Sequence, residues 1–268
     1  MILIYLIYFF LILRFTVTLF NFISNPKLTH TGKRYKDLVS ILIPARDEER
    51  NIIDLLESIR DQDYQNFEVI VLDDHSSDQT FKLCSDFCKI HKGFKVVKGQ
   101  DLPKDWLGKN YACSQLADLA KGEYLIFLDA DETIADGLIN NSIHRMKLNK
   151  LKLLSIFTDQ VTVTWGERLV VPLMHFLLLN LLPLRLVRLS GNPSFSAASG
   201  QFMMFDADNY RTNQWHELVK GKVVEDVEIM KLIKVNGYKA EALLANGYIH
   251  CRMYRSFSEA VEGFSKNF

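Results

Sequence analysis

Four carboxylates follow two apolar runs of the sequence, and their positions suit the binding of a charged ligand. Asp73 and Asp74 follow the first run, and Asp129 and Asp131 follow the second. Carboxylates placed this close repel one another unless a cation or another ligand is held among them. An Asp-x-Asp sequence after a strand indicates Mg²⁺ or Mn²⁺ held against phosphates, because these ions prefer oxygen ligands.

The sequence Asp-Ala-Asp occurs twice, and the two copies have different interpretations. The copy at 129–131 follows a continuous apolar run, which favours metal binding. The copy at 206–208 opens a segment with helical spacing, so we interpret Asp206 as the cap of a helix N-terminus. We therefore expect the metal site at the first copy.

Other polar residues near the first carboxylates fit a nucleotide site. Asp74 can accept hydrogen bonds from a base edge or a ribose, as acids at strand ends do in nucleotide-binding folds. Ser77 and Asp78 match a helix cap, which leaves Asp73 and Asp74 available to a ligand. Lys109 precedes a helix and can reach a diphosphate, with an ordinary surface lysine as the alternative.

The elements that position these residues alternate along the chain. Apolar runs predict strands at 38–44, 67–74, 94–99, 123–131 and 153–163. Helical spacing predicts helices at 48–62, 78–91 and 110–122, the last closed by Gly122 at its C-cap. A strand and a helix are predicted within 199–212, and a helix that ends at Gly237 and a strand within 223–243. This alternation is typical of an α/β domain with a largely parallel sheet.

Polar residues follow each of the first four predicted strands. Arg46 and Glu48 come after Pro44 at the end of the first strand, and surface roles are the alternative for both. In sheets of this kind ligands bind outside the carboxyl ends of the strands. The sequence therefore predicts one site along one edge of the sheet.

The first 23 residues differ from the rest because they are almost entirely apolar. About 20 such residues can cross a bilayer as a helix, so 1–23 predicts a membrane anchor, with a globular core helix as the alternative. Arg14 is costly near the middle of such a span. The polar residues 24–37 predict a linker. Its four basic residues place the catalytic domain on the cytoplasmic side of the cell (inner) membrane by the positive-inside tendency.

A second strongly apolar segment, 168–189, contains Pro172 and Pro183. We interpret it as a segment that contacts the membrane, and a buried core helix or a second span are the alternatives. The prolines, together with His175 and Asn180, argue against an uninterrupted span.

Composition limits the class of protein. The chain has 268 residues, of which 48% are apolar, enough for one α/β core and a membrane element. Equal numbers of basic and acidic residues argue against a nucleic-acid partner. The four cysteines show neither a CxxC pair nor zinc spacing, and we interpret them as reduced structural thiols, which favours a cytosolic catalytic region.

Four stretches of the chain resemble the family 2 glycosyltransferases. They are "VSILIPARDEERNI" (39–52), "FEVIVLDDHSSDQT" (67–80), "GEYLIFLDADE" (122–132) and "VVEDVEI" (223–229). Their order and spacing match the family over most of the chain, which is more specific than any one stretch. The resemblance implies the GT-A nucleotide-diphospho-sugar transferase fold, with a Rossmann-like, mixed and mostly parallel sheet, over 38–250.

The resemblance also implies roles for single residues. Asp74 would contact the uracil or ribose of a UDP-sugar, and Asp226 would be the general base. Asp129 and Asp131 would form the metal motif, with Asp131 as the direct ligand of Mg²⁺ or Mn²⁺. His250 is either a further metal ligand or a core or surface histidine. The other residues expected in the nucleotide-sugar site are Pro44, Arg46, Glu48, Asp73 and Lys109.

Three stretches narrow the resemblance to membrane-bound enzymes that glycosylate lipids. "WLGKN" (106–110), "SGQFMMF" (199–205) and "RMYRSFSEAVEGFSKN" (252–267) are similar to carotenoid and hopanoid-associated glycosyltransferases. The implied acceptor is a carotenoid or other isoprenoid, glycosylated with inversion, with Gln201 and Glu225 on the acceptor side.

In such relatives further membrane helices follow, so 251–268 is expected to be a tail that leads to them. The Gln-x-x-Arg-Trp signature of processive polysaccharide synthases is absent, which disfavours a polymer product. A polyprenyl-phosphate sugar transferase, a polysaccharide-type synthase and a non-catalytic nucleotide-sugar binding protein are the alternatives.

Overall fold

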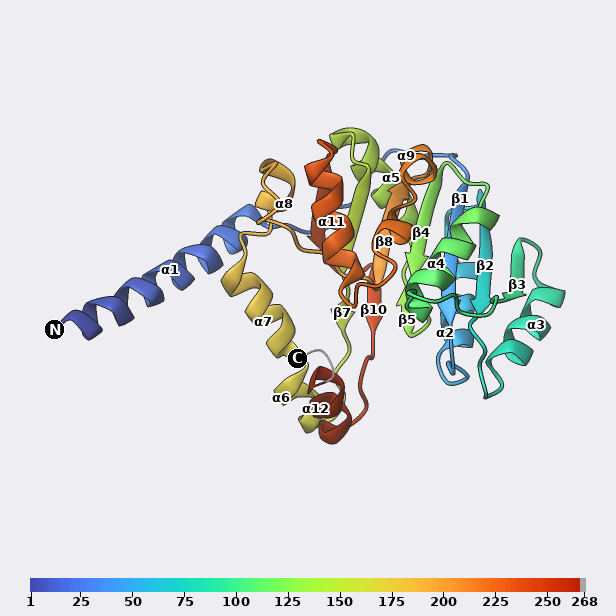
Figure 1. The fold of residues 1–268 in the computed structure, drawn as a ribbon, viewed down its shortest axis with the longest axis horizontal. Helices are drawn as coiled ribbons and strands as arrows, with labels where there is room; N and C mark the ends of the chain where they lie inside the picture. Colours follow the sequence, from blue (N-terminus) through green and yellow to red (C-terminus); the bar gives the residue numbers. More distant parts are fainter. Residues whose placement is uncertain (266–268) are drawn as a thin grey trace.

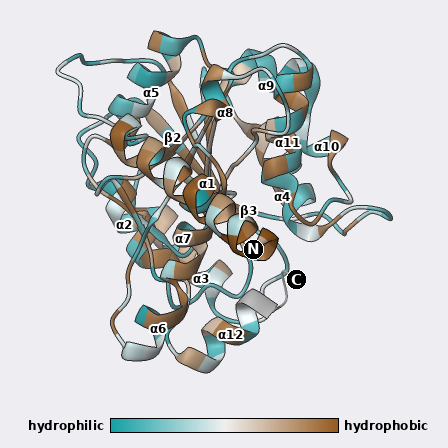
Figure 2. Ribbon diagram, turned by 90° about the vertical axis from the view of Figure 1, so that its left-hand side faces the viewer, coloured by the Kyte–Doolittle hydropathy of each residue, from teal (hydrophilic) through white to brown (hydrophobic). Residues whose placement is uncertain are grey.

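The computed structural model describes residues 1–265 and consists of a long N-terminal helix and an α/β domain (Figure 1). Helix α1 (Ile2–Ser24) projects away from the domain and is exposed over nearly all of its length. Among the described residues it is the one helix long and apolar enough to cross a membrane. Figure 2 shows hydrophobic residues along much of α1.

A sheet of seven strands forms the centre of the domain, and it is mixed and mostly parallel, as predicted. Its order is β3-β2-β1-β4-β8-β6-β9, and β8 runs antiparallel to both of its neighbours while the other pairs are parallel. The strands are β1 (Val39–Ala45), β2 (Phe67–Asp73), β3 (Phe94–Lys98), β4 (Tyr124–Leu128), β6 (Leu153–Phe157), β8 (Phe202–Asp206) and β9 (Ala240–Leu244).

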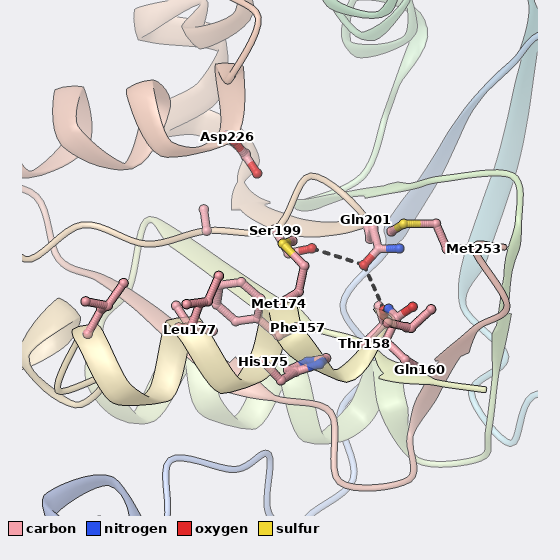
Figure 3. A pocket seen from close by; sticks show the side chains of 14 residues that line it. Phe157, Thr158, Gln160, Met174, His175, Leu177, Ser199, Gln201, Asp226 and Met253 are labelled. Carbon is pink, nitrogen blue, oxygen red and sulfur yellow. Dashed lines mark hydrogen bonds between the residues drawn. The ribbon is translucent and has the colours of Figure 1, made fainter. Parts of the chain in front are cut away.

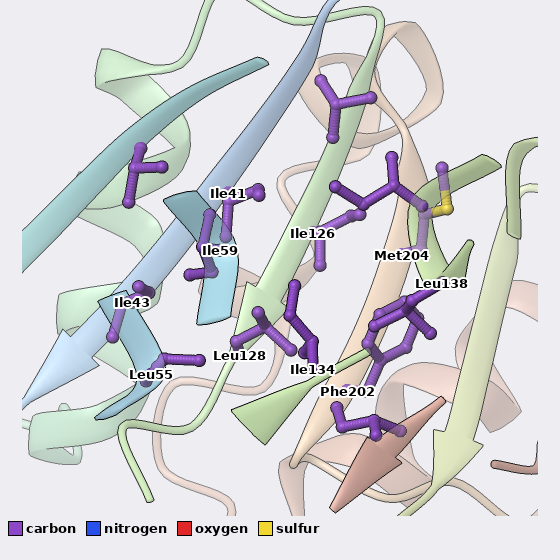
Figure 4. Close-up of a cluster of buried hydrophobic side chains, with 14 of the residues drawn as sticks. Ile41, Ile43, Leu55, Ile59, Ile126, Leu128, Ile134, Leu138, Phe202 and Met204 are labelled. Carbon is purple, nitrogen blue, oxygen red and sulfur yellow. The ribbon is translucent and has the colours of Figure 1, made fainter. Parts of the chain in front are cut away.

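Helices cover both faces of this sheet because the strands are apolar on both sides. Ile41 and Ile43 point to one face, while Leu42 points to the other. Figure 4 shows Ile41 and Ile43 of β1 beside Leu55 and Ile59 of α2. The first face carries α2 (Ile52–Arg60), α3 (Thr80–Ile90) and α5 (Leu138–Asn149). The second carries α4 (Gly108–Leu119), α9 (Ala207–Asn213), α10 (Trp215–Leu218) and α11 (Glu225–Val235).

A second, three-stranded sheet lies beyond the end of β4 and was not predicted. Its strands are β5 (Glu132–Ile134), β10 (Ile249–Cys251) and β7 (Asp159–Gln160), in that order. The predicted strand 153–163 is in fact divided between β6 and β7. The small sheet brings residues near 250 beside the Asp-Ala-Asp sequence at 129–131.

The apolar segment 168–189 forms parts of three short helices rather than one. They are α6 (Trp165–Val170), α7 (Pro172–Leu181) and α8 (Leu186–Leu189). Pro172 stands in the first turn of α7, where a proline is tolerated. Ten helical residues extend about 15 Å, half the thickness of a bilayer core, so α7 does not form the second span considered above.

Helix α7 is held beside α1 by polar contacts. The amide of Asn21 donates to the carbonyls of Leu179 and Leu182, each at 2.8 Å, and its oxygen accepts from the backbone of Leu184. Thr18 donates to Asn180 at 2.6 Å. None of the residues of α7 is buried, so the helix presents an apolar surface next to α1.

Two local predictions are wrong. Helix α4 ends at Leu119, so Gly122 is not its C-cap. A side chain at position 122 would lie 2.6 Å from the amide nitrogen of Ser40, so close packing explains why a glycine stands there. Ser77 caps no helix, because its amide and hydroxyl donate to Asp47, whereas Asp78 accepts from the amide of Thr80. The capping role of Asp206 is confirmed by its bond with Asn209.

The predicted linker and tail both contact the domain. Leu28 is fully buried, and its amide donates to the carbonyl of Leu244. In the predicted tail 251–268, Cys251 belongs to β10 and α12 (Phe257–Ser265) follows, while residues 266–268 lie outside the described residues.

Candidate active site

A polar cavity of about 470 Å³ opens at the carboxyl ends of β1, β2 and β4. Seven of the eight residues expected to hold the nucleotide-sugar and the metal line it: Pro44, Arg46, Glu48, Asp74, Lys109, Asp129 and Asp131. The eighth, Asp73, is buried at the end of β2, and its Oδ1 has no hydrogen-bond partner among the described residues.

The strand order explains why these residues meet. Strand β1 lies between β2 and β4 and pairs in parallel with both. In the register Ala45 is opposite Asp73, and the amide of Asp74 donates to the carbonyl of Ala45 at 2.8 Å. Residues far apart in the sequence therefore leave the sheet at the same edge, as expected.

Lys109 lies among carboxylates at one side of the cavity. Its Nζ is 2.6 Å from Asp129 Oδ1 and 3.8 Å from Glu225 Oε1. Burial is the largest single influence and lowers the pKa of Lys109, but the attraction of Asp129 and Glu225 and the hydrogen bond to Asp129 outweigh it together, so the pKa is raised. The lysine is therefore charged and available to a diphosphate, since 40% of its side chain is exposed.

The cavity also holds a group of neighbouring acids, Glu48, Asp129 and Asp131. Burial raises the pKa of Glu48, and repulsion by Asp131 and Asp129 adds to this, while a hydrogen bond from Asn51 acts against it. Burial, and then Asp129, likewise raise the pKa of Asp131. A cation at this position would relieve that repulsion.

Asp131 lies in a cluster with two residues that the sequence did not suggest. Ligand atoms of Asp131, Glu132 and Cys251 all lie within 4.8 Å of one another. The Cys251 thiol donates to Asp131 Oδ2 at 3.4 Å. His250, the alternative ligand, lies next to Cys251 on β10, so the two side chains point to opposite faces of the strand.

A second cavity, of about 270 Å³, lies against α7 and is mainly apolar (Figure 3). Met174 and Leu177 of α7 face Phe157 of β6 across it. Gln201, expected on the acceptor side, lines this cavity and accepts hydrogen bonds from Thr158 at 2.8 Å and Ser199 at 3.3 Å. Glu225, expected there too, lies instead beside Lys109.

Asp226 lines the apolar cavity and lies close to a residue of the polar cavity. It lies in the first turn of α11 and its side chain points into the apolar cavity (Figure 3). Its carboxylate accepts hydrogen bonds from the amides of Gly200 at 2.9 Å and Val227 at 2.7 Å. A side chain on Gly200 would lie 3.3 Å from the Nζ of Lys109, which lines the polar cavity. The two hydrogen bonds fix the orientation of this carboxylate. Burial raises the pKa of Asp226, so the carboxylate is more basic than that of an ordinary aspartate.

Comparison with known proteins identifies the family. The family model "Glycosyl transferase family 2" matches residues 40–212, which is more than half of the chain. The chain belongs to glycosyltransferase family 2. Over 237 residues the chain is 27% identical to the 4,4'-diaponeurosporenoate glycosyltransferase of Staphylococcus haemolyticus. The match covers 85% of this chain and 60% of the relative, so the chain spans about three fifths of that relative's length.

Solved structures share the fold and confirm the GT-A-like architecture. The mannosyltransferase PcManGT of Pyrobaculum calidifontis, in complex with GDP-Man and Mn²⁺, superposes with a TM-score of 0.60 at 18% identity, covering 88% of this chain and 67% of that one. TarS of Staphylococcus aureus, in complex with UDP, gives a TM-score of 0.55 at 20% identity, covering 80% of this chain and 60% of that one.

Proposed function

We propose that this chain is the catalytic part of a membrane-associated, inverting glycosyltransferase that moves a hexose from a UDP-sugar to a lipid acceptor. The observation that carries the proposal is the position of Asp226 in the wall of an apolar cavity, close to Lys109 of a charged cavity. The charged cavity suits a nucleotide diphosphate, and the apolar cavity suits a hydrocarbon chain.

The donor is assigned to the polar cavity. Asp74, at a strand end, suits the ribose or uracil, and Arg46 lies 3.8 Å from it. Lys109 is placed to contact the diphosphate from the other side. Asp73 is buried and does not line the cavity, so we assign it a structural role next to Asp74 and no contact with the donor.

A divalent cation fits this cavity. Asp131 offers carboxylate oxygens, and the buried carboxyl of Glu132 beside it has no hydrogen-bond partner among residues 1–265. When bound, such an ion supplies positive charge that stabilises the leaving diphosphate. The name of the PcManGT complex, which includes Mn²⁺, supports this assignment.

The acceptor is assigned to the apolar cavity. Asp226 would accept the proton of an acceptor hydroxyl or carboxylic acid as it attacks the anomeric carbon, and its two backbone hydrogen bonds fix its orientation. An isoprenoid such as a carotenoid suits the aliphatic walls formed by Met174 and Leu177. The name of the relative from S. haemolyticus, which specifies diaponeurosporenoate, supports this class of acceptor.

The acceptor would come from the bilayer. Helix α1 is the proposed anchor over residues 1–23, and the hydrogen bonds of Asn21 fix α7 to it. The outer surface of α7 is exposed and apolar, including Leu173 and Phe176, while other side chains of α7 line the cavity. We therefore place α7 at the cytoplasmic surface of the cell membrane, where it forms one wall of the acceptor site.

Lipid analysis tests this function. Cells that produce the protein are compared by mass spectrometry with cells that lack it and with cells that produce Asp131→Ala. A hexosylated isoprenoid is expected in the first cells alone. The same lipids in all three would contradict the proposal, and so would full activity of the Asp131→Ala protein.

A further inference from the structure

Glu132 is an unusual residue in the described part of the chain because its acid group is buried without a partner. The residue is 1% exposed, and neither carboxyl oxygen has a hydrogen bond within residues 1–265. A buried carboxylate of this kind is costly unless it meets a cation or a donor. The unsatisfied oxygens therefore indicate that a ligand belongs here.

The two sheets determine what surrounds Glu132. In the antiparallel pairing of β5 with β10, Glu132 is directly opposite Cys251, so the two side chains lie on the same face of the sheet. Asp131 precedes Glu132 and also lines the polar cavity. The three ligand atoms lie within 4.8 Å of one another, the separation expected of atoms that share one ion at about 2.0–2.5 Å.

We propose that Asp131, Glu132 and Cys251 together hold the divalent cation of this enzyme, with the thiolate sulfur of Cys251 as one ligand. The inference rests on the proposed function for the role of the ion, but the ligand set rests on the β5–β10 pairing. On binding, the thiol of Cys251 releases its proton to solvent as the sulfur–metal bond forms.

The ligand set selects the kind of ion. Two carboxylates alone would suit Mg²⁺, but thiolate ligands favour softer ions. The site should therefore bind Zn²⁺ and Co²⁺ more tightly than Mg²⁺. Metal preference in this chain would then depend on a residue of β10, more than a hundred positions beyond the Asp-x-Asp sequence.

Cobalt absorption tests the ligand set without an activity assay. Co²⁺ is titrated into the purified full chain in detergent, and the near-ultraviolet band of a cobalt–thiolate bond is recorded. The wild type should show the band, Cys251→Ser should lack it, and Cys88→Ser, which changes a thiol on α3, should retain it. Zn²⁺ should displace Co²⁺ at a concentration at which Mg²⁺ does not.

A second variant, Glu132→Gln, separates loss of metal binding from loss of folding. Glu132→Gln removes the buried charge and keeps the shape, so the metal-free protein should melt at or above the wild-type temperature. Its affinity for Co²⁺ should fall by about tenfold or more while the sulfur band remains at saturation. Unchanged affinity in Glu132→Gln would remove Glu132 from the ligand set.

The outcomes separate this inference from the proposed function. A cobalt–sulfur band that depends on Cys251, with no sugar transfer to any lipid, would support the ligand set and contradict the function. Metal-dependent sugar transfer with no cobalt–sulfur band in the wild type would support the proposed function and contradict the ligand set. An identical band in the wild type and in Cys251→Ser would overturn the inference.

Discussion

The two cavities of this family 2 chain lie close to each other near Gly200 but are built in different ways. The polar cavity is formed by the ends of parallel strands in the centre of the domain. One wall of the apolar cavity is α7, a helix with no buried residue that is tied to the N-terminal helix. The charged donor is therefore assigned to a site in the centre of the domain, and the lipid acceptor to a site with one wall at the periphery.

The largest effect should come from Asp226, which lines the apolar cavity and lies close to Lys109 of the polar cavity. Asp226→Asn keeps the size of the side chain but removes the base, so kcat should fall by about 10²–10⁴-fold. Binding of UDP, measured by calorimetry, should stay close to wild type, because Asp226 lies on the acceptor side. A loss of UDP affinity as large as the loss of kcat would place Asp226 in the donor site and contradict the division into two cavities.

A smaller effect is expected from the polar cavity alone. Lys109→Met removes the cation that contacts Asp129 and that we assign to the diphosphate, so UDP affinity should fall about tenfold to hundredfold. Lys98→Met is the matched control, because Lys98 lies at the end of β3 and stacks over Phe81. Equal losses in both variants would show a general effect of surface charge rather than a contact with the donor.

A change in the apolar cavity should affect the acceptor and not the donor. Leu177→Glu places a charge in the cavity wall, so the KM for a lipid acceptor should rise about tenfold or more. Leu173→Glu, on the outer surface of α7, tests contact with the membrane instead. Assays in detergent should show the defect in Leu177→Glu alone, with UDP-sugar hydrolysis unchanged in both. The same defect in both would mean that α7 acts through its outer surface only.

The mildest test is the pH profile. A base works when ionised, and burial raises the pKa of Asp226, so kcat should fall on the acid side with a midpoint above the ordinary value of 3.8. Because the folded-state pKa is the higher one, ionised Asp226 costs stability at neutral pH, and this cost disappears as pH falls through the raised pKa. The remaining activity of Asp226→Asn should lack this transition. A midpoint at or below 3.8 would contradict the account.

The polar cavity was largely predictable from sequence, and the comparison of the cavities shows why. Pro44 lies at the end of β1, and Asp74 and Asp129 directly follow β2 and β4. Local patterns and the rule of parallel sheets therefore bring the three together. The position of Asp73 was less predictable. The pairing of β2 with β1 ends at Asp73, so Asp73 is still part of the strand and Asp74 is not, and the sequence does not show where between the two the strand ends.

The remaining features depend on packing between distant segments. Glu132 and Cys251 meet through a three-residue pairing that leaves no periodic signal in the sequence. Apart from His175 and Asn180, all residues of α7 are apolar, so its composition alone could not show which residues line a cavity and which face outward. Its position depends on the contacts of Asn21 with the backbone beyond α7.

The central claim is that both cavities serve one transfer reaction at Asp226. The most direct measurement incubates the purified full chain with a radiolabelled UDP-hexose, a divalent cation and an isoprenoid acceptor, and then counts the label extracted into organic solvent. Label should enter the organic phase with the wild type and remain with UDP in Asp226→Asn, although the variant still binds UDP. Equal transfer by Asp226→Asn, or label that appears only in a water-soluble polymer, would contradict the account.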